Sequence, residues 1–434
     1  MSTLILRDVV MPWRGAATVD VSVSGAVVTS IDPAGASLAQ PGTQDVDCTG
    51  LIALPSFIDL HTHIREPGRE NAETAESASR AALAGGFTTL HAMANTTPVA
   101  DTAQAIDAVW RRGVDLGLVD IRPVGAITIG LAGHELAPIA AMHDTEAAPT
   151  VFSDDGHCVQ RADLMRAALL EVARFDGVIA QHAQESTLTR DAQLNEGEIS
   201  RALGMRGWPA VAESLIVARD VMLAADTGGR LHICHVSSAQ TVEVLRWAKS
   251  RGVPVTAEVT PHHLLLVDDA ALSGDAVYKV NPPLRTAADV AAVREALADG
   301  TIDIVATDHA PHEPAHKSCA WPDAAMGMLG LETAFCVVYE TMVASGLMSW
   351  QRLWEAMSST PARIAGLAWS LPEPAAVADL VLIDPDAVWS VEPAGLQSLS
   401  RNTPFTARAM QGSVAMTVRH GRISFTDTTS RTQI

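Results

Sequence analysis

The segment FIDLHTHIREPG (residues 57–68) shows the pattern that organises most of this chain. A short apolar run ends in His61 and His63, and both imidazoles point to the same side of a strand because side chains alternate between its faces. Alanine-rich segments with helical periodicity, such as residues 70–86 and 241–252, separate this run from similar runs further along. Alternating strands and helices predict βα units around a parallel sheet.

The same kind of run occurs eight times, and this number indicates a closed barrel. The runs are FIDLHTH (57–63), FTTLHAM (87–93), IRPVGAIT (121–128), TVFSDDG (150–156), GVIAQHA (177–183), RLHICHVS (230–237), VPVTAEVT (253–260) and IDIVATDHA (302–310). Eight βα units predict an α/β fold of the (β/α)8 TIM-barrel type. A doubly wound open sheet is the alternative that the same alternation allows.

The two ends of the chain have a different pattern. Residues 1–52 and 372–434 contain short strand-like stretches, such as LILRDVV and VAMTVRHG, separated by glycine and proline. We predict that the two ends pair into one small β-sandwich, with residues 1–52 as its N-terminal part and 372–434 as its C-terminal part. Residues 53–371 then form the barrel.

Composition excludes several classes of protein. Of the 434 residues, 48% are hydrophobic and 18% are charged, which is typical of a globular protein with a large core. A formal charge of −20 argues against nucleic acid or an anionic membrane as a partner. No apolar run approaches the roughly 20 residues of a membrane span. The N-terminal residues lack the features of an export signal and the five cysteines have unrelated spacings, so we expect reduced thiols and a cytoplasmic protein.

The positions of the polar residues indicate a metal centre. Catalytic groups of a barrel enzyme project from the C-terminal ends of its strands. A single Asp or Asn there is readily explained as a helix cap, but a set of histidines and aspartates is not. Neutral imidazoles with carboxylates suit zinc, and this number of ligands suits two ions that share a bridge. Six of the eight runs end in such residues: His61, His63, Asn95, Asp155, His182, His235 and Asp308.

These motifs, taken together and in order, resemble those of a known family. The chain resembles the bacterial class I dihydroorotases, which are metal-dependent (β/α)8 enzymes of the amidohydrolase superfamily. The resemblance covers the whole barrel, and the flanks fit the composite β domain of that superfamily. It is carried by DLHTHIREPG (59–68), MANTTP (93–98), FSDDG (152–156), HICHVSS (232–238), EVTPHHL (258–264), KVNPPLR (279–285) and ATDHAPH (306–312).

The resemblance implies two zinc ions. One would be held by His61, His63 and Asp308, the second by His182 and His235, and Asp155 would bridge them. Of the two aspartates in FSDDG we assign the bridge to Asp155, which precedes the glycine, and a supporting role to Asp154.

The lysines of this chain distinguish two kinds of relative. Many members of the superfamily bridge their metals with a carbamylated lysine on the fourth strand. This chain contains three lysines, Lys249, Lys279 and Lys317, and none lies between His61 and the fifth strand. The bridge must therefore be an ordinary carboxylate, which favours the aspartate-bridged dihydroorotases over hydantoinase-like and allantoinase-like relatives. Because aspartate is much shorter than carbamylated lysine, we expect the second zinc to bind less tightly.

The resemblance also implies a substrate site and a reaction. The reaction is the reversible hydrolysis of L-dihydroorotate to N-carbamoyl-L-aspartate, a step of de novo pyrimidine (UMP) biosynthesis, with Asp308 as general base and then acid. Ala94 and Met326 depart from the usual Pro and Phe of the family, and we expect them to alter fit rather than chemistry. Arg65, Asn95 and His312 correspond to residues that hold the substrate carboxylate, and His63, Asn281, Met326 and Gly327 to further substrate contacts.

Other readings remain open at this point. A different cyclic-amide hydrolase would keep the metals but lack the pair Arg65 and Asn95. A catalytically silent subunit that scaffolds aspartate carbamoyltransferase should have lost metal ligands, whereas this chain keeps all six. We expect a homodimer that acts on a small molecule, and association with aspartate carbamoyltransferase is left open. The remaining histidines receive no direct role: His262 and His263 are expected to support a turn, and His157 and His309 to support neighbouring ligands.

Overall fold

The eight predicted runs form a closed parallel barrel. The computed structural model describes residues 3–427, and within them neighbouring barrel strands pair in chain order. Parallel bridges between Gly125 and Phe152, and between Thr62 and His309, close the ring that the two sheets leave open. The barrel prediction is confirmed, and the open sheet is wrong. The strands are β6 (Phe57–Thr62), β7 (Phe87–Ala92), β8 (Asp120–Pro123), β9 (Val151–Phe152), β10 (Val178–Gln181), β13 (Arg230–Ile233), β14 (Val255–Val259) and β15 (Ile304–Val305).

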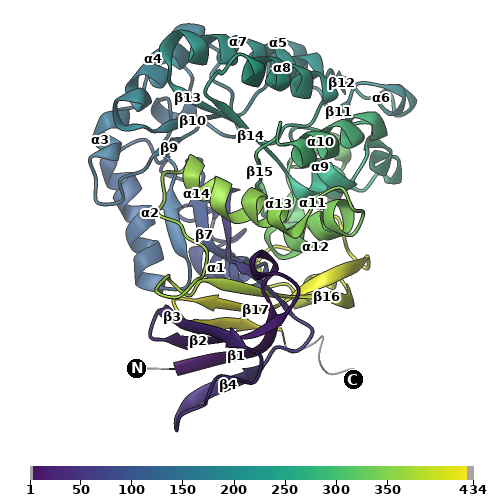
Figure 1. Cartoon of the computed structure of the whole chain (residues 1–434). Coiled ribbons are helices and arrows are strands. Elements are labelled where there is room, and N and C mark those ends of the chain that lie inside the picture. Colours follow the sequence, from purple (N-terminus) through teal and green to yellow (C-terminus); the bar gives the residue numbers. More distant parts are fainter. Residues whose placement is uncertain (1–2, 428–434) are drawn as a thin grey trace.

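Helices surround the barrel (Figure 1). Their starts follow capping chemistry: Thr74 accepts a hydrogen bond from the backbone N–H of Ser77, and Ser238 accepts one from Thr241. Gly117 and Gly228 end two of them in the left-handed conformation, at φ of 61° and 70°. The longer helices are α1 (Ala75–Ala84), α2 (Ala103–Leu116), α4 (Ala162–Val172), α7 (Val211–Thr227), α8 (Ala239–Ser250) and α10 (Ala287–Asp299).

Shorter elements lie in the loops between strands and helices. A small parallel pair, β11 (Leu194–Asn195) and β12 (Gly207–Trp208), lies in the segment between β10 and α7. The short helices are α3 (Ile139–His143), α5 (Ser186–Thr189), α6 (Glu198–Ala202), α9 (Pro261–Leu265), α11 (Pro314–Lys317), α12 (Ala334–Val338), α13 (Trp350–Trp354) and α14 (Thr360–Ile364).

Strands from both ends of the chain form one eight-stranded sheet below the barrel (Figure 1). The two ends join where β5 pairs antiparallel with β16, with Leu380 opposite Pro55. Leu6, Val21 and Val418 are fully buried in its core. The composite domain is therefore present, and its exact boundaries stay predictions. The strands are β1 (Thr3–Val10), β2 (Thr18–Ser24), β3 (Val27–Pro33), β4 (Thr43–Asp47), β5 (Ile52–Pro55), β16 (Leu380–Ser390), β17 (Ala409–Arg419) and β18 (Arg422–Thr426).

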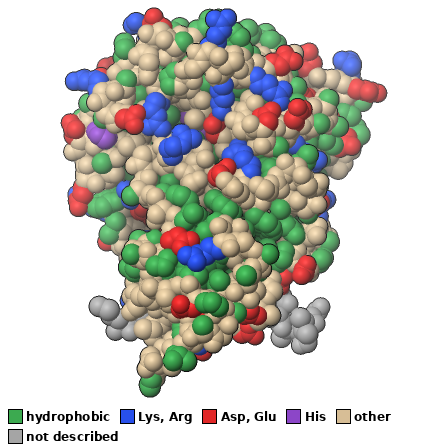
Figure 2. Space-filling view, in the orientation of Figure 1, with side chains coloured by type: hydrophobic (Ala, Val, Ile, Leu, Met, Phe, Trp, Pro, Cys, Tyr) green, Lys and Arg blue, Asp and Glu red, His purple; other side chains and the backbone are tan. Residues whose placement is uncertain are grey.

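Packed side chains fill the barrel below its C-terminal mouth. Ile58, Val151 and Ile304, from the strands β6, β9 and β15, belong to one buried cluster. The interior is therefore a core rather than a pore, and the predicted metal ligands lie at or next to the C-terminal ends of the strands. In the view of Figure 2, charged side chains of both signs are scattered over the barrel, and apolar ones gather near the terminal sheet. Within residues 3–427, no helix is long and apolar enough to cross a membrane.

Phe57 anchors the layer between barrel and helices and gives a test of this packing. Its fully buried ring lies 5.5 Å from Phe87 and 6.2 Å from Phe335, measured between ring centroids. We expect Phe57→Ala to lower the free energy of unfolding by about 3–5 kcal/mol, because the rings of Phe87 and Phe335 cannot close the cavity that it leaves. Urea denaturation followed by circular dichroism measures this change. Leu38→Ala, at a side chain that is 81% exposed, serves as the control and should cost little.

Candidate metal centre

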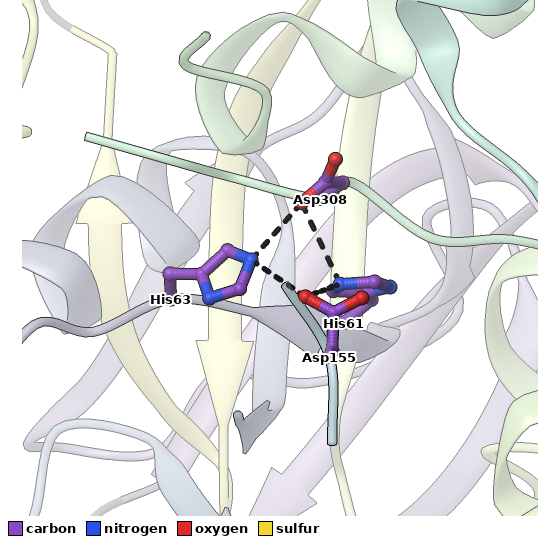
Figure 3. A group of neighbouring side chains, drawn as sticks. All are labelled: His61, His63, Asp155 and Asp308. Atoms are coloured by element: carbon purple, nitrogen blue, oxygen red, sulfur yellow. Dashed lines mark hydrogen bonds and ion pairs between the residues drawn. The ribbon is translucent and has the colours of Figure 1, made fainter. Parts of the chain in front are cut away.

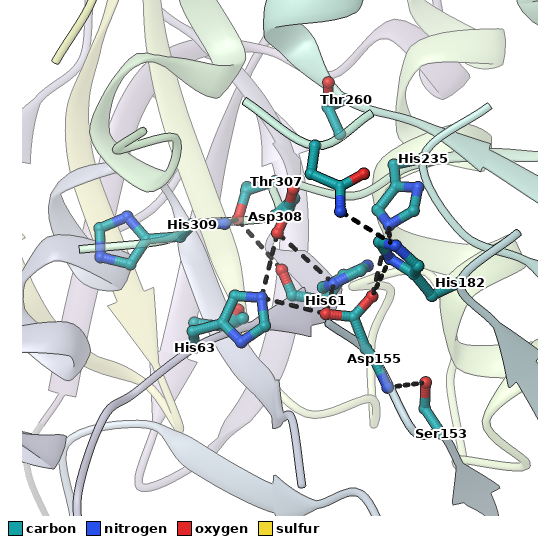
Figure 4. A network of polar contacts seen from close by, with 12 residues as sticks. His61, His63, Ser153, Asp155, His182, His235, Thr260, Thr307, Asp308 and His309 are labelled. Carbon is teal, nitrogen blue, oxygen red and sulfur yellow. Dashed lines mark hydrogen bonds and ion pairs between the residues drawn. The ribbon is translucent and has the colours of Figure 1, made fainter. Parts of the chain in front are cut away.

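The six predicted ligands lie together at the C-terminal mouth of the barrel, with Asp155 between the other five (Figures 3 and 4). Asp155 Oδ2 lies 3.1 Å from His61 Nε2 and 3.3 Å from His63 Nε2. Its other oxygen, Oδ1, lies 3.2 Å from His182 Nδ1 and 3.3 Å from His235 Nε2. All five side chains are buried. One carboxylate therefore faces two pairs of imidazoles, one pair with each oxygen.

Asp308 completes the first of these two groups. Its Oδ1 lies 3.1 Å from His63 Nε2 and 3.5 Å from His61 Nε2. In the second group, His182 Nδ1 and His235 Nε2 are 2.9 Å apart. In each group, the potential ligand atoms all lie within 4.8 Å of one another.

The hydrogen bonds of the histidines show that this donor set fits a divalent metal. Oxygen acceptors engage the outer ring nitrogens: Glu258 Oε1 lies 2.6 Å from His61 Nδ1, and Asn95 Oδ1 lies 2.9 Å from His63 Nδ1. Gln184 Oε1 lies 2.9 Å from His182 Nε2. If these outer nitrogens carry the protons, the inner nitrogens present lone pairs to carboxylate oxygens.

That arrangement is well suited to a bound cation. A lone pair and a carboxylate oxygen at about 3 Å repel each other unless positive charge lies between them. His61 Nε2 is buried and has no hydrogen-bond partner among residues 3–427, as expected for a nitrogen reserved for a metal. Imidazole and carboxylate together suit zinc and neighbouring divalent metals.

Glu258 is the supporting residue that the sequence analysis missed. It lies on β14, fully buried, and its Oε2 is 3.0 Å from His232 Nε2 while its Oε1 contacts His61. Burial raises the pKa of Glu258, but His61 and His232 outweigh it and hold the pKa at about 2. An anionic partner on the outer nitrogen orients a ligand and raises its basicity. A carboxylate inside the apolar run VPVTAEVT was the available sequence signal.

The electrostatics of Asp155 follow from the same crowding. Burial by itself raises the pKa of this carboxyl group. The surrounding imidazoles, with His61 foremost, outweigh burial and hold the pKa of Asp155 well below its ordinary value. Asp155 is therefore ionised and available as a bridging ligand.

The strand ends turn sharply where the functional side chains leave them. Arg65, His235 and Asp308 have positive φ values of 60°, 34° and 46°, a region that residues with a Cβ rarely adopt. The surrounding structure holds these turns in place. The Asp59 carboxylate accepts hydrogen bonds from Thr307 N at 2.9 Å, Thr307 Oγ1 at 2.5 Å and Thr62 Oγ1 at 2.6 Å. These bonds fix the backbone next to Asp308. Strained backbone conformations of this kind, with positive φ at residues other than glycine, concentrate at functional sites.

Arg65 is placed as a residue that binds an anion would be. It is buried, and its Nε donates to the Pro311 carbonyl at 3.1 Å. Its two terminal nitrogens form no hydrogen bond within the part of the chain that the structure describes. Burial, and after it the charge of Arg69, lowers the pKa of Arg65 to about 10, so the guanidinium stays cationic at neutral pH.

Of the other predicted substrate residues, Asn281 contacts the centre directly, and His312, Met326 and Gly327 lie together in a neighbouring loop region. Asn281 Nδ2 lies 3.2 Å from His182 Nε2 and 3.1 Å from Gln184 Oε1. His312 Nε2 lies 2.9 Å from the Met326 carbonyl, so its buried Nδ1, which has no partner in residues 3–427, is the acceptor. Gly327 has φ of 133°, and a Cβ there would lie 2.9 Å from His312 Nε2. Only glycine lets this loop approach the imidazole so closely.

Several neighbouring residues support the fold instead. Asp154 accepts hydrogen bonds from the backbone N–H groups of Ile127 and Thr128, at 2.8 and 2.9 Å. His309 contacts Glu73 with Nε2 at 3.3 Å and accepts from Gly330 N with Nδ1. The supporting role expected for Asp154 thus consists of fixing a loop.

Fold and site together define an amidohydrolase with a candidate metal centre, and comparison with known structures agrees with this class. L-Hydantoinase (dihydropyrimidinase) from Arthrobacter aurescens superposes with a TM-score of 0.85 at 25% identity, over 98% of this chain and 96% of that one. Dihydropyrimidinase from Brevibacillus agri NCHU1002 shares the fold with a TM-score of 0.83 at 21% identity, over 97% of this chain and 94% of that one.

Sequence comparison identifies the family within this class. A family model described as "Dihydro-orotase-like" matches residues 50–241. The dihydroorotase of Streptomyces coelicolor is 54% identical over 413 residues, covering 94% of this chain and 95% of the relative. That of Mycobacterium tuberculosis is 50% identical over 433 residues, covering 98% and 99%. The chain belongs to the dihydroorotase family.

The contact between Glu258 and His61 predicts an effect on metal affinity. We expect Glu258→Gln to weaken binding of zinc about 10- to 100-fold, because a neutral amide cannot hold the outer nitrogen of His61 as a carboxylate does. Titration of the metal-free protein with zinc, followed by calorimetry, gives the affinity. Glu243→Gln, at an exposed position on α8, is the matched control. Equal affinities for the two variants would contradict the role assigned to Glu258.

Proposed function

We propose that this protein is a dihydroorotase, which reversibly hydrolyses the ring amide of L-dihydroorotate to N-carbamoyl-L-aspartate in pyrimidine biosynthesis. The observation that carries the proposal is the buried Asp155, which offers one oxygen to each of two imidazole pairs. The buried Arg65, whose terminal nitrogens form no hydrogen bond within residues 3–427, adds a group that can bind the substrate carboxylate. Membership of the dihydroorotase family supports the same substrate.

The proposed cofactor is a pair of zinc ions. His61, His63 and Asp308 would hold one, His182 and His235 the other, and Asp155 would bridge them. When bound, such ions supply Lewis acidity toward a carbonyl oxygen and make water a better nucleophile at neutral pH. The absence of any lysine before the fifth strand supports an aspartate bridge rather than a carbamylated lysine.

Asp308 is the proposed acid–base group. Its carboxylate is buried at the barrel mouth, held by the turn that follows Thr307. It would accept a proton from the attacking water as the new carbon–oxygen bond forms. It would return that proton to the ring nitrogen as the carbon–nitrogen bond breaks, so that the open product leaves with a neutral carbamoyl group.

The charged end of the substrate is proposed to bind between Arg65 and Asn95. A planar guanidinium can bind both oxygens of a carboxylate, and the Arg65 terminal nitrogens are free for this within residues 3–427. Asn95 uses its Oδ1 for His63, which leaves its amide N–H groups as donors. His312 presents Nδ1 as an acceptor, which suits a ring N–H of the substrate better than its carboxylate.

An assay with both reactants tests the proposed function. Zinc-loaded protein is incubated with L-dihydroorotate, or with N-carbamoyl-L-aspartate, and the ring's ultraviolet absorbance is followed to equilibrium. We expect conversion in both directions and little turnover of hydantoin or allantoin. Conversion of hydantoin alone would overturn the proposal and favour a hydantoinase.

The proposal also includes a homodimer, an association with aspartate carbamoyltransferase and a cytoplasmic location. Sedimentation velocity tests the homodimer and the association. Cell fractionation tests the location.

Asp308→Asn should reduce turnover of dihydroorotate about 10²–10⁴-fold, because the amide can neither accept nor return the proton. The fold should remain, since an amide has nearly the same shape, and circular dichroism checks this. Zinc content is measured on the same samples to separate loss of the base from loss of a ligand. Asp299→Asn, which removes a surface ion pair with Arg246, is the control and should keep full activity. An Asp308→Asn enzyme within a few-fold of wild type would disprove the assignment.

Arg65→Lys should raise the KM for dihydroorotate far more than it lowers kcat. A lysine is a point charge and cannot make the two-pronged contact with a carboxylate. Dihydrouracil, which has the same ring without the carboxylate, should show a much smaller change. Arg80→Lys, at an exposed ion pair with Glu76, provides the comparison. Equal losses for both ring compounds would mean that Arg65 supports the structure only.

A further inference from the structure

Two buried lysines lie in the loops that carry predicted substrate residues, and neither has a carboxylate partner within residues 3–427. Of the three lysines in the chain, Lys279 and Lys317 are only 3% and 8% exposed. The third, Lys249, forms an ordinary ion pair with Asp303 at 2.7 Å. Neither buried lysine has such a pair within residues 3–427. Because a buried ammonium is costly unless its donors are satisfied, these two positions call for an explanation.

Backbone carbonyls satisfy both ammonium groups, and each lysine reaches into the segment that carries the other. Lys279 Nζ donates to the carbonyls of Trp321 and Pro322, at 2.7 and 3.0 Å. Lys317 Nζ donates to the carbonyls of Ala276, Lys279 and Ala325, at 3.0, 2.9 and 2.8 Å. The segment 275–281 and the segment 312–328 are thus joined in both directions.

These two segments carry most of the predicted contacts to the substrate ring. Asn281 ends the first segment, two residues after Lys279. His312 begins the second, and Met326 and Gly327 lie near its end. The Lys279 carbonyl also accepts a hydrogen bond from Gly327 N at 2.9 Å, next to its bond with Lys317. The lysines therefore fix the loops that face the substrate, whereas the metal ligands come from the barrel strands.

Lysine suits this task better than arginine does. An ammonium has three donors in a compact tetrahedral arrangement, and Lys317 directs all three at converging carbonyls. A guanidinium is larger and flat, and its donors spread in one plane. Burial, and after it the charge of Lys279, lowers the pKa of Lys317 to about 7. The lowered pKa shows that burying this ammonium group is unfavourable.

We propose that Lys279 and Lys317 are positioning residues, which hold the segments 275–281 and 312–328 in the geometry that binds the substrate ring. The inference rests on the proposed function for the identity of that ring. The mutual contacts of the two segments stand independently of it.

Replacement of each lysine by methionine tests the proposal, since methionine keeps an unbranched apolar stem and removes the donors. For Lys317→Met and Lys279→Met we expect kcat/KM for dihydroorotate to fall about 10²-fold, mainly through KM, because the contact residues shift by a fraction of an ångström or more. Zinc content should stay at the wild-type level. Lys249→Met removes an ion pair elsewhere and should leave KM unchanged.

Hydrogen–deuterium exchange of the substrate-free proteins gives a readout that does not depend on activity. Peptides within 275–281 and 312–328 should exchange faster in both variants, while the barrel strands exchange as in wild type. Lys249→Met should not show this pattern. An unchanged KM, or faster exchange spread evenly over the whole chain, would overturn the proposal. A wild-type protein that does not convert dihydroorotate would overturn the proposed function, and the exchange pattern would still decide whether the lysines join the two segments.

Discussion

A single buried carboxylate, Asp155, imposes the constraint on which the rest of the site depends. It lies at about 3 Å from four imidazole nitrogens, two on each of its oxygens. In water such a cluster would spread apart, and it holds together here because four different barrel strands deliver the groups to one point. A closed parallel barrel holds side chains from several strands rigidly at its C-terminal mouth. A cation bound there would interact with all of them.

The surroundings of the histidines make this cluster specific. Glu258, Asn95 and Gln184 each occupy the outer nitrogen of one ligand and so direct its inner nitrogen toward the carboxylates. Each comes from a different part of the chain. The outer contacts therefore favour protonation of the outer nitrogens and leave the inner nitrogens free to bind a cation. The buried Glu258 places a negative charge next to His61, which raises the basicity of that imidazole.

The substrate side of the site has a different construction. Its predicted residues come from loops above the strands, and loops need extra bonds to hold a fixed shape. Asn402 illustrates this: its side chain accepts from His312 N at 3.0 Å and donates to the Ala310 carbonyl at 3.0 Å. Together with the contacts of Lys279 and Lys317, it gives these loops the order that the barrel gives to the metal ligands.

The barrel, the composite terminal domain and the six residues that gather around Asp155 could all be predicted from the sequence alone. Strand patterns are local, and a period of two places His61 and His63 on one face whatever the rest of the chain does. Only the tertiary structure decided which partners surround those ligands. Glu258 stands out as a carboxylate within an apolar run, and Lys317 resembles an ordinary surface cation, but in neither case does the local sequence reveal the partners. Their roles follow from contacts with His61 and with the 275–281 segment, across long stretches of chain that only folding brings together.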